Sequence, residues 1–152
     1  MKVRYNTILV AVDGSEESKR ALRKAIVLAK DHEAKLLLVH IIDSLTTIPA
    51  GRGYKAIFPE SDTYAREMLN EYKELAEKEG IKDVTEILDY GSPKVRIAKD
   101  VAKKYNVDVI VAGAAGANAV EQFLIGSVAQ HITRYAPCDV LIVRTEMENR
   151  SQ

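Results

Sequence analysis

The chain has one cysteine, no excess charge of either sign and no long apolar run. The single cysteine, Cys138, cannot form an internal disulfide, which fits a reducing compartment. No apolar stretch approaches the roughly 20 residues that a membrane span needs, and residues 1–6 lack the apolar region of a signal peptide. We therefore expect a cytoplasmic protein with neither a membrane span nor a structural disulfide.

The charges of the chain balance. Its 22 basic and 22 acidic residues cancel, so no overall field would draw it to nucleic acid or to an anionic membrane. The histidines show no metal-ligand spacing with one another or with Cys138. His40 lies inside an apolar run, where a hydrogen-bonded core histidine is the expected state. These residues therefore predict no metal site of their own and no pairing of a nucleophile with a base.

Apolar runs alternate with helical patterns along the chain. A length of 152 residues fits one domain, and this alternation predicts a parallel sheet with helices on both faces. We expect a single Rossmann-like α/β domain over residues 1–152, with an open five-stranded sheet in the order 3-2-1-4-5. The third run is mixed in polarity, which suits an edge strand. The predicted strands are residues 7–12, 36–42, 84–89, 107–112 and 139–144.

Two segments fall outside the alternation. Residues 43–60 contain two prolines and two glycines and show no sustained period, and a connection of this length inside a compact domain is usually functional. Residues 145–152 form a polar tail. The helix after the long connection is predicted to start at Ser61 or Asp62 and to pack through one face. The side chains expected on that face are Tyr64, Met68, Tyr72 and Leu75.

The most informative spacing is that of the glycines after the fourth run. Gly113-x-x-Gly116 is separated by nine residues from Gly126-Ser127, between a buried strand and a helix predicted over 128–135. Glycines let a backbone approach a ligand closely, and the amides at a helix N-terminus can hold a phosphate. In the predicted order, strands one and four are neighbours, so this loop and the turn after strand one would line one crevice. The pattern predicts a nucleotide site.

Electrostatics distinguishes the two loops of this crevice. The helix after strand one opens with Glu16 and Glu17, which would repel a phosphate at its amides. The helix after the glycine loop has no acid in its first turn, so the phosphates are assigned to residues 126–128. Asp13 suits ribose hydroxyls, or a Mg²⁺ ion held together with the phosphates. The alternative role for Asp13 is a structural Asx turn or a helix cap.

Three stretches of the chain carry a resemblance to a known family. They are Val10-Ala11-Val12-Asp13-Gly14-Ser15, the glycine spacing described above, and Ala136-Pro137-Cys138-Asp139-Val140-Leu141-Ile142-Val143-Arg144. Through these residues, the chain from Thr7 to Arg144 resembles the universal stress protein family. The resemblance implies a small stress-response protein that binds an adenine nucleotide, ATP with or without Mg²⁺, and acts as a homodimeric sensor or regulator.

The resemblance also implies where the nucleotide would lie. The residues that it assigns to nucleotide contact, from the adenine to the phosphates, are Ala11, Val12, Ile41, Asp13, Ala112, Gly113, Gly116, Gly126, Ser127 and Val128. The first three would border the adenine, and Asp13 would meet the ribose. The glycines of the loop would pass under the phosphates, and residues 126–128 would cap them.

One departure from the family concerns charge. Many members have polar or basic side chains around the second glycine, whereas residues 114–117 of this chain include three alanines, and the only charge between the glycines is Glu121. Charge-assisted contacts are roughly twice as strong as neutral ones, so we expect weak binding or a metal requirement. Arg52 or Lys55 of the long connection could supply the missing charge by folding over the site.

The last strand points to self-association. In the predicted order it lies at an edge of the sheet, and an apolar edge invites pairing with another chain. Antiparallel pairing with a second copy across a two-fold axis would satisfy that edge. The residues predicted to form this homodimer contact are Val140, Leu141, Ile142 and Val143.

Other classes of protein fit the sequence less well. An enzyme that hydrolyses the nucleotide would need charge stabilisation as well as a positioned base, and Glu121 alone suggests slow turnover at most. A phospho-receiver domain could use Asp13 and Asp89, but Arg144 stands where its lysine is expected. A dinucleotide enzyme lacks its G-x-G-x-x-G after strand one. A family member without nucleotide binding would act purely through protein contacts.

Overall fold

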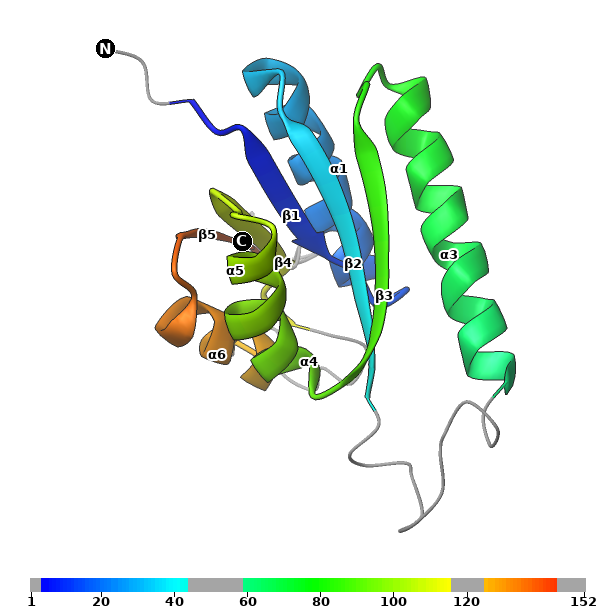
Figure 1. The fold of residues 1–152 in the computed structure, drawn as a ribbon, viewed down its shortest axis with the longest axis vertical. Coiled ribbons are helices and arrows are strands. Elements are labelled where there is room, and N and C mark those ends of the chain that lie inside the picture. The colour runs from blue at the N-terminus through cyan, green and yellow to red at the C-terminus, as the bar shows by residue number, and fades with distance from the viewer. Residues whose placement is uncertain (1–3, 44–58, 116–124, 145–152) are drawn as a thin grey trace, which may run out of the picture.

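Five parallel strands form the sheet in the described part of the chain (Figure 1). The computed structural model describes residues 4–43, 59–115 and 125–144. The strands are β1 (Thr7–Ala11), β2 (Lys35–Asp43), β3 (Val84–Gly91), β4 (Val109–Gly113) and β5 (Asp139–Val143). Every neighbouring pair is parallel, and their order is β3-β2-β1-β4-β5. The predicted order and direction are therefore confirmed.

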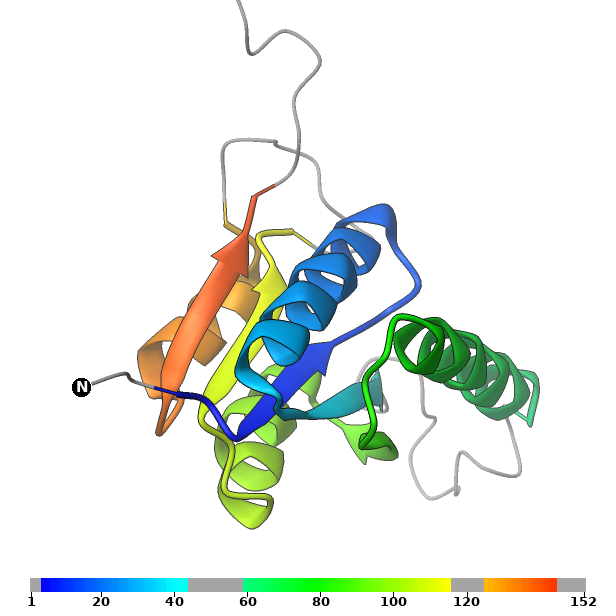
Figure 2. The same cartoon turned by 90° about the horizontal axis from the view of Figure 1, so that it is seen from above.

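Helices cover both faces of the sheet, as Figure 2 shows from above. On one face lie α1 (Glu16–His32) and α3 (Pro59–Lys78). On the other lie α6 (Ser127–Tyr135) and one helical segment interrupted by a π-helical stretch. The parts of that segment are α4 (Pro93–Val95), η1 (Arg96–Val101) and α5 (Ala102–Lys104). This arrangement confirms the predicted layers.

The side chains of the strands alternate between these two layers. Ile8 and Val10 of β1 join the core beneath α1 and α3, whereas Leu9 joins the core beneath η1 and α6. On β2, Leu36 and Leu37 divide in the same way, and both are fully buried. A strand that is buried on both faces must be apolar at every position. For this reason the central strands appear in the sequence as continuous apolar runs.

The packed face of α3 differs from the prediction. Tyr64 and Leu75 are 57% and 39% exposed, so two of the four residues expected in the core lie outside it. The face that packs contains Ala65, Met68, Leu69, Tyr72 and Ala76. The prediction gave weight to the aromatic residues, but α3 approaches the sheet closely through two alanines. The helix also starts at Pro59, earlier than expected.

Two smaller predictions have structural outcomes. His40 Nδ1 lies 2.7 Å from the carbonyl oxygen of Val12, which confirms a hydrogen-bonded histidine inside the fold. Cys138 is half-buried, and burial, followed by the nearby carboxylates of Asp139 and Asp108, raises the pKa of its thiol. A raised pKa leaves little thiolate at neutral pH, which makes this thiol a poor nucleophile. No helix in the described ranges is both long and apolar enough to cross a membrane.

Candidate functional site

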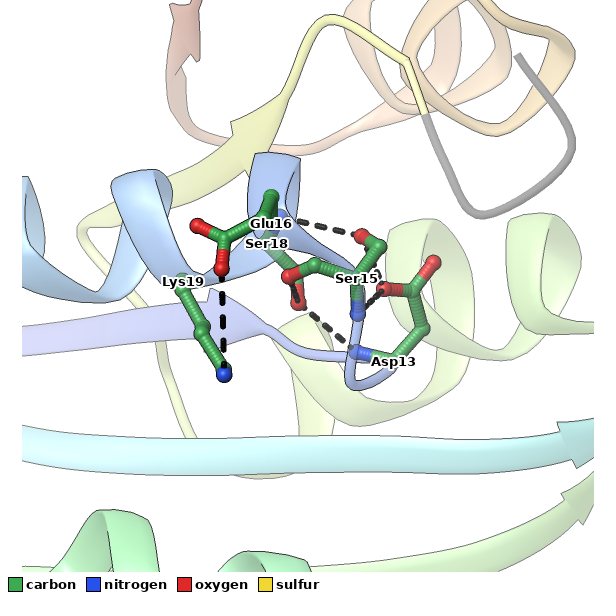
Figure 3. A network of polar contacts seen from close by, with 5 residues as sticks. All are labelled: Asp13, Ser15, Glu16, Ser18 and Lys19. Atoms are coloured by element: carbon green, nitrogen blue, oxygen red, sulfur yellow. Dashed lines mark hydrogen bonds and ion pairs between the residues drawn. The ribbon is translucent and has the colours of Figure 1, made fainter.

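The turn between β1 and α1 holds Asp13 in a local hydrogen-bond network (Figure 3). Asp13 Oδ1 accepts hydrogen bonds from the Ser15 amide at 2.9 Å and from Ser15 Oγ at 2.5 Å. Ser15 Oγ in turn accepts from the Ser18 amide at 3.1 Å, so Ser15 caps α1. Ser18 Oγ accepts from the Asp13 amide at 3.2 Å. Asp13 therefore has the structural role considered above, that of an Asx turn before α1.

That structural role uses only one oxygen of Asp13. The side chain is exposed, and within the described part of the chain Oδ2 has no hydrogen-bond partner. Figure 3 shows this oxygen directed away from Ser15. A carboxylate held through Oδ1 presents Oδ2 as an oriented acceptor for a hydroxyl group. The two roles proposed for Asp13 are thus compatible rather than exclusive.

Gly14 lets α3 approach this turn. Its φ of +85° lies in the left-handed region, and a Cβ at this position would stand 2.5 Å from the hydroxyl oxygen of Tyr64. Tyr72, on the next turns of α3, is also near: burial, with Tyr64, Glu71 and Asp13 as weaker causes, raises its pKa to about 12. The sequence prediction missed this contact, although a glycine directly after Asp13 was the available signal.

Replacement of Gly14 tests what this glycine is needed for. We expect Gly14→Ala to lower the free energy of unfolding by roughly 1–2 kcal/mol, the usual cost of a left-handed non-glycine residue. Tyr64→Phe in the same background removes the blocking hydroxyl. Because the exposed Tyr64 ring can rotate outward, we expect it to recover only a small part of the loss in urea unfolding. Full recovery would show that the contact with α3, and not the backbone conformation, sets the cost.

The glycine loop leaves β4 and returns to it. The amide of Ala114 donates to the carbonyl oxygen of Val143 at 2.8 Å, which ties the start of the loop to β5. The amide of Gly126 then donates to the carbonyl oxygen of Ala114 at 2.7 Å, which closes the loop at its far end. Residues 116–124 lie outside the described residues. The predicted nucleotide contact at Gly116 and the charge of Glu121 fall in this range. Arg52 and Lys55 also lie outside the described residues.

The N-terminus of α6 is free of competing groups in its described surroundings. Gly126 is the N-cap, no side chain caps the helix, and its first turn has no acid. The amides of the first turn have no partner within a helix. Since the Gly126 amide is bound to Ala114, the amides left without a partner among the described residues are those of Ser127, Val128 and Ala129, and the first two are the predicted phosphate contacts. Gly126 contributes instead by having no side chain between them and a ligand.

The N-termini of α1 and α6 therefore differ in the charge that they favour. Ser15 caps α1, and Glu16 and Glu17 stand in its first turn. The N-terminus of α6 offers uncapped amides and carries the positive end of the helix dipole. An anion is favoured at α6 and disfavoured at α1, as the sequence predicted.

The predicted contact residues gather at the carboxyl ends of the central strands. β1 pairs with both β2 and β4, so its end at Ala11, two residues before Asp13, lies between the ends of β2 and β4. A Cβ on Gly113 would stand 3.0 Å from the carbonyl oxygen of Glu17, so the glycine loop starts against the first turn of α1. The apolar side chains among the predicted contact residues are largely buried in the core. Their exposed fractions are 3% for Val12, 4% for Ile41 and 4% for Ala112.

A metal ion at this site would need oxygen atoms from a bound ligand as well as from the protein. No group of three or more His, Cys, Asp or Glu side chains that could hold a metal is found among the described residues. Asp13 supplies one unpartnered carboxylate oxygen, whereas Mg²⁺ prefers six oxygen ligands and commonly takes several from substrate phosphates and water. Asp13 is thus suited to complete the coordination of a Mg²⁺ that arrives with a phosphate chain.

A second polar cluster lies at the end of β3. Asp89 forms an ion pair with Arg96, which also lies 3.3 Å from Asp100. Burial works against ionisation of Asp89, but the Tyr90 amide and Arg96 together hold the pKa of its carboxyl below the usual value. β3 is one of the two edge strands of the sheet and is separated from β1 by β2. The Asp13–Asp89 pairing that a phospho-receiver would need is therefore absent, because receiver domains place the third strand beside the first.

These features define a class of protein: an open parallel α/β fold with an uncapped helix N-terminus at the point where the winding reverses. The family model described as "Universal stress protein family" matches residues 4–144. A Staphylococcus aureus protein named as a universal stress protein is 49% identical over 145 residues, which cover 95% of this chain and 87% of that protein. The chain therefore belongs to the universal stress protein family.

Solved structures agree with this assignment. A universal stress protein in complex with cAMP has 27% sequence identity and a TM-score of 0.75, covering 95% of this chain and 100% of that one. The Archaeoglobus fulgidus universal stress protein in complex with dAMP has 25% identity and a TM-score of 0.70, covering 93% and 100%. Both solved relatives hold adenine nucleotides.

Proposed function

We propose that this protein binds an adenine nucleotide and acts as a cytoplasmic stress-response sensor or regulator. The observation that carries the proposal is the uncapped, acid-free N-terminus of α6. It lies at the carboxyl ends of the strands, as does the oriented Asp13 carboxylate. The first suits a phosphate and the second suits a ribose hydroxyl. The cAMP and dAMP complexes of solved relatives support the choice of an adenine base.

The parts of the nucleotide would meet different elements. The adenine would lie over the ends of β1 and β2, against Ala11, Val12 and Ile41. The sugar would donate to Asp13 Oδ2. The phosphate nearest the sugar would accept from the amides of residues 127–128, with Ala112 and Gly113 beneath it. This places apolar groups at the base and amides at the anion, the usual division of labour in a small-molecule site.

We propose ATP with Mg²⁺ as the ligand of this site. The described ends of the glycine loop, residues 113–115 and 125–128, contain no basic side chain. Two amides can hold one phosphate group, but the charge of a triphosphate needs further compensation. Mg²⁺ bound between the phosphates and Asp13 would supply it. The proposal therefore carries a requirement: binding of ATP should depend on Mg²⁺ much more than binding of AMP.

We also propose that the protein is a homodimer through β5. In the described part of the sheet, β5 pairs only with β4, so its outer edge has free backbone groups. Val140, Leu141 and Ile142 are half-buried and pack against the two cores, which leaves part of each at that edge. Light scattering at micromolar concentration should give the mass of a dimer, and a monomer would contradict this part of the proposal.

Calorimetric titration tests the proposed ligand. The protein is first stripped of any nucleotide that co-purifies, and then titrated with ATP, AMP and cAMP, each with and without Mg²⁺. We expect heat on addition of ATP with Mg²⁺ and a much weaker signal when the metal is removed. If no nucleotide gives heat at millimolar concentration, the protein would be a family member that acts through protein contacts alone, an alternative favoured by its three loop alanines.

A further inference from the structure

The layer formed by α4, η1, α5 and α6 carries an excess of positive charge. Residues 93–104 contain five basic residues and one acidic residue, and α6 contains Arg134 and no acid. On the opposite face of the sheet, α3 contains six acidic and three basic residues, and α1 contains three acidic and five basic residues. The zero net charge of the chain is thus the sum of regions with opposite sign. Composition alone conceals this separation, and with it a local field that a charged partner would feel.

An exposed aromatic ring belongs to this layer. Tyr135, the last residue of α6, is 46% exposed. Lys99 Nζ lies 4.9 Å from the centre of its ring, and Arg134 Cζ lies 5.7 Å from it. The His131 ring, one turn earlier, lies 4.5 Å away. Cations within about 6 Å of an aromatic face are attracted to it, so both positive groups are held beside the exposed ring.

Lys94 completes this group from the neighbouring helix. α4 packs against α6 (Figure 1), and burial, followed by the charges of Lys99 and Lys94, lowers the pKa of His131. The Nε2 atom of His131 is buried without a hydrogen-bond partner among the described residues. We refer to Lys94, Lys99, His131, Arg134 and Tyr135 as the basic patch.

The positive charges of the basic patch are not neutralised in the described part of the chain. None of the carboxylates there lies within ion-pair distance of Lys94, Lys99 or Arg134. The one acid of the helical segment, Asp100, lies 3.3 Å from Arg96 instead. Lys99 and Arg134 lie beside one ring and Lys94 acts on the neighbouring His131, so a partner that brings negative charge would relieve the repulsion among these like charges.

We propose that the basic patch binds an acidic segment of a partner protein, in which carboxylates flank one apolar side chain. The carboxylates would pair with Lys94, Lys99 and Arg134, and the apolar side chain would rest on the Tyr135 ring. Tyrosine and arginine are the residues that most often anchor protein interfaces. Complementary charge around such an anchor speeds association and selects the partner. The proposal does not depend on nucleotide binding.

A nucleic acid fits the same surface less well. Nucleic acids are held through contacts to many phosphates, and single strands also use several aromatic platforms for successive bases. The basic patch offers three cations and one ring. Beyond it, the acidic residues of α3 and the zero net charge of the chain provide no further attraction for a long polyanion. A short acidic segment needs nothing beyond the patch itself.

Fluorescence anisotropy with a defined probe tests the proposal. The probe is a short labelled peptide whose glutamates flank one leucine, and the full-length protein is titrated into it at low salt. We expect saturable binding that weakens as salt is added. The double variant Lys99→Gln, Arg134→Gln should bind about tenfold more weakly, as expected for two charge contacts. Tyr135→Ser should also weaken binding, with less effect on its salt dependence.

The control variant is Arg23→Gln, Lys24→Gln, which removes the same charge from exposed positions of α1 on the other face of the sheet. It should bind the peptide as the parent does. Equal losses in both double variants, or no binding at low salt, would overturn the proposal. So would equal binding of a peptide with glutamine in place of glutamate. A single-stranded oligonucleotide that bound through the patch while the peptide did not would replace the proposed partner with a nucleic acid.

Discussion

Gly126→Asp should weaken nucleotide binding at least about tenfold without unfolding the protein. Gly126 is the N-cap of α6, with φ −65° and ψ 163°, a conformation that any residue adopts. Aspartate is a favoured N-cap residue, so the substitution should stabilise the helix slightly. Its carboxylate would stand at the amides proposed for the phosphate, and like charges about 4 Å apart repel by roughly 1–4 kcal/mol near a protein surface. Calorimetry measures the change in affinity.

Gly126→Asn is the matched control for this experiment. Asparagine has nearly the same size and the same capping ability as aspartate, but it carries no charge. We expect Gly126→Asn to lose much less affinity than Gly126→Asp. Both variants should unfold at a urea concentration equal to or higher than that of the parent. Equal losses would mean that a side chain of any kind blocks the site. Unchanged affinity in both variants would mean that the nucleotide does not reach the N-terminus of α6.

Gly113→Ala should lower both stability and nucleotide affinity. The added Cβ would stand 3.0 Å from the carbonyl oxygen of Glu17 and 3.2 Å from that of Ala115, and both contacts are backbone atoms. Overpacking of this kind costs typically about 1–3 kcal/mol. Because Glu17 belongs to the first turn of α1, the shift that relieves the contact should also move the Asp13 turn. Urea unfolding and calorimetry on the same sample measure the two effects.

Gly80→Ala separates these two effects. Gly80 follows α3, has a φ of +102° and has nothing within 4 Å of the position of an added Cβ. Alanine there should lower stability by roughly 1–2 kcal/mol through its left-handed backbone alone. It should leave nucleotide affinity unchanged, because the end of α3 lies away from the site. If Gly113→Ala lost stability but bound nucleotide as Gly80→Ala does, the packing of Gly113 would be structural only.

The sheet and the outline of the site could be predicted because both are local in sequence. The runs that form β1, β2 and β4 are apolar at almost every position, because strands buried on both faces require apolar residues. The position of Asp13 after one strand and of Gly113 after another identified the two loops, since parallel strands end at one edge. Order 3-2-1-4-5 then made those loops neighbours, which the pairing of β1 with β4 confirms.

Features that depend on close approach between elements could not be predicted in this way. The inner face of α3 includes Ala65 and Ala76, whose burial is decided by how near the helix comes to the sheet and not by hydrophobic strength. The Gly126 amide is bound to Ala114, a pairing between the two ends of a loop that no spacing reveals. The acidic helix α3 and the basic layer lie on opposite faces, and the zero net charge of the whole chain conceals both.

Mapping of backbone amide shifts by NMR would show whether a nucleotide binds at the N-terminus of α6. Stripped, isotope-labelled protein is titrated with ATP and Mg²⁺, and the shift of each amide is followed. We expect the largest changes at Ser127 and Val128, with smaller changes at Asp13, Ser15 and Gly113. Absence of shifts at saturating nucleotide, or shifts confined to surfaces away from the carboxyl ends of β1 and β4, would contradict the proposed site.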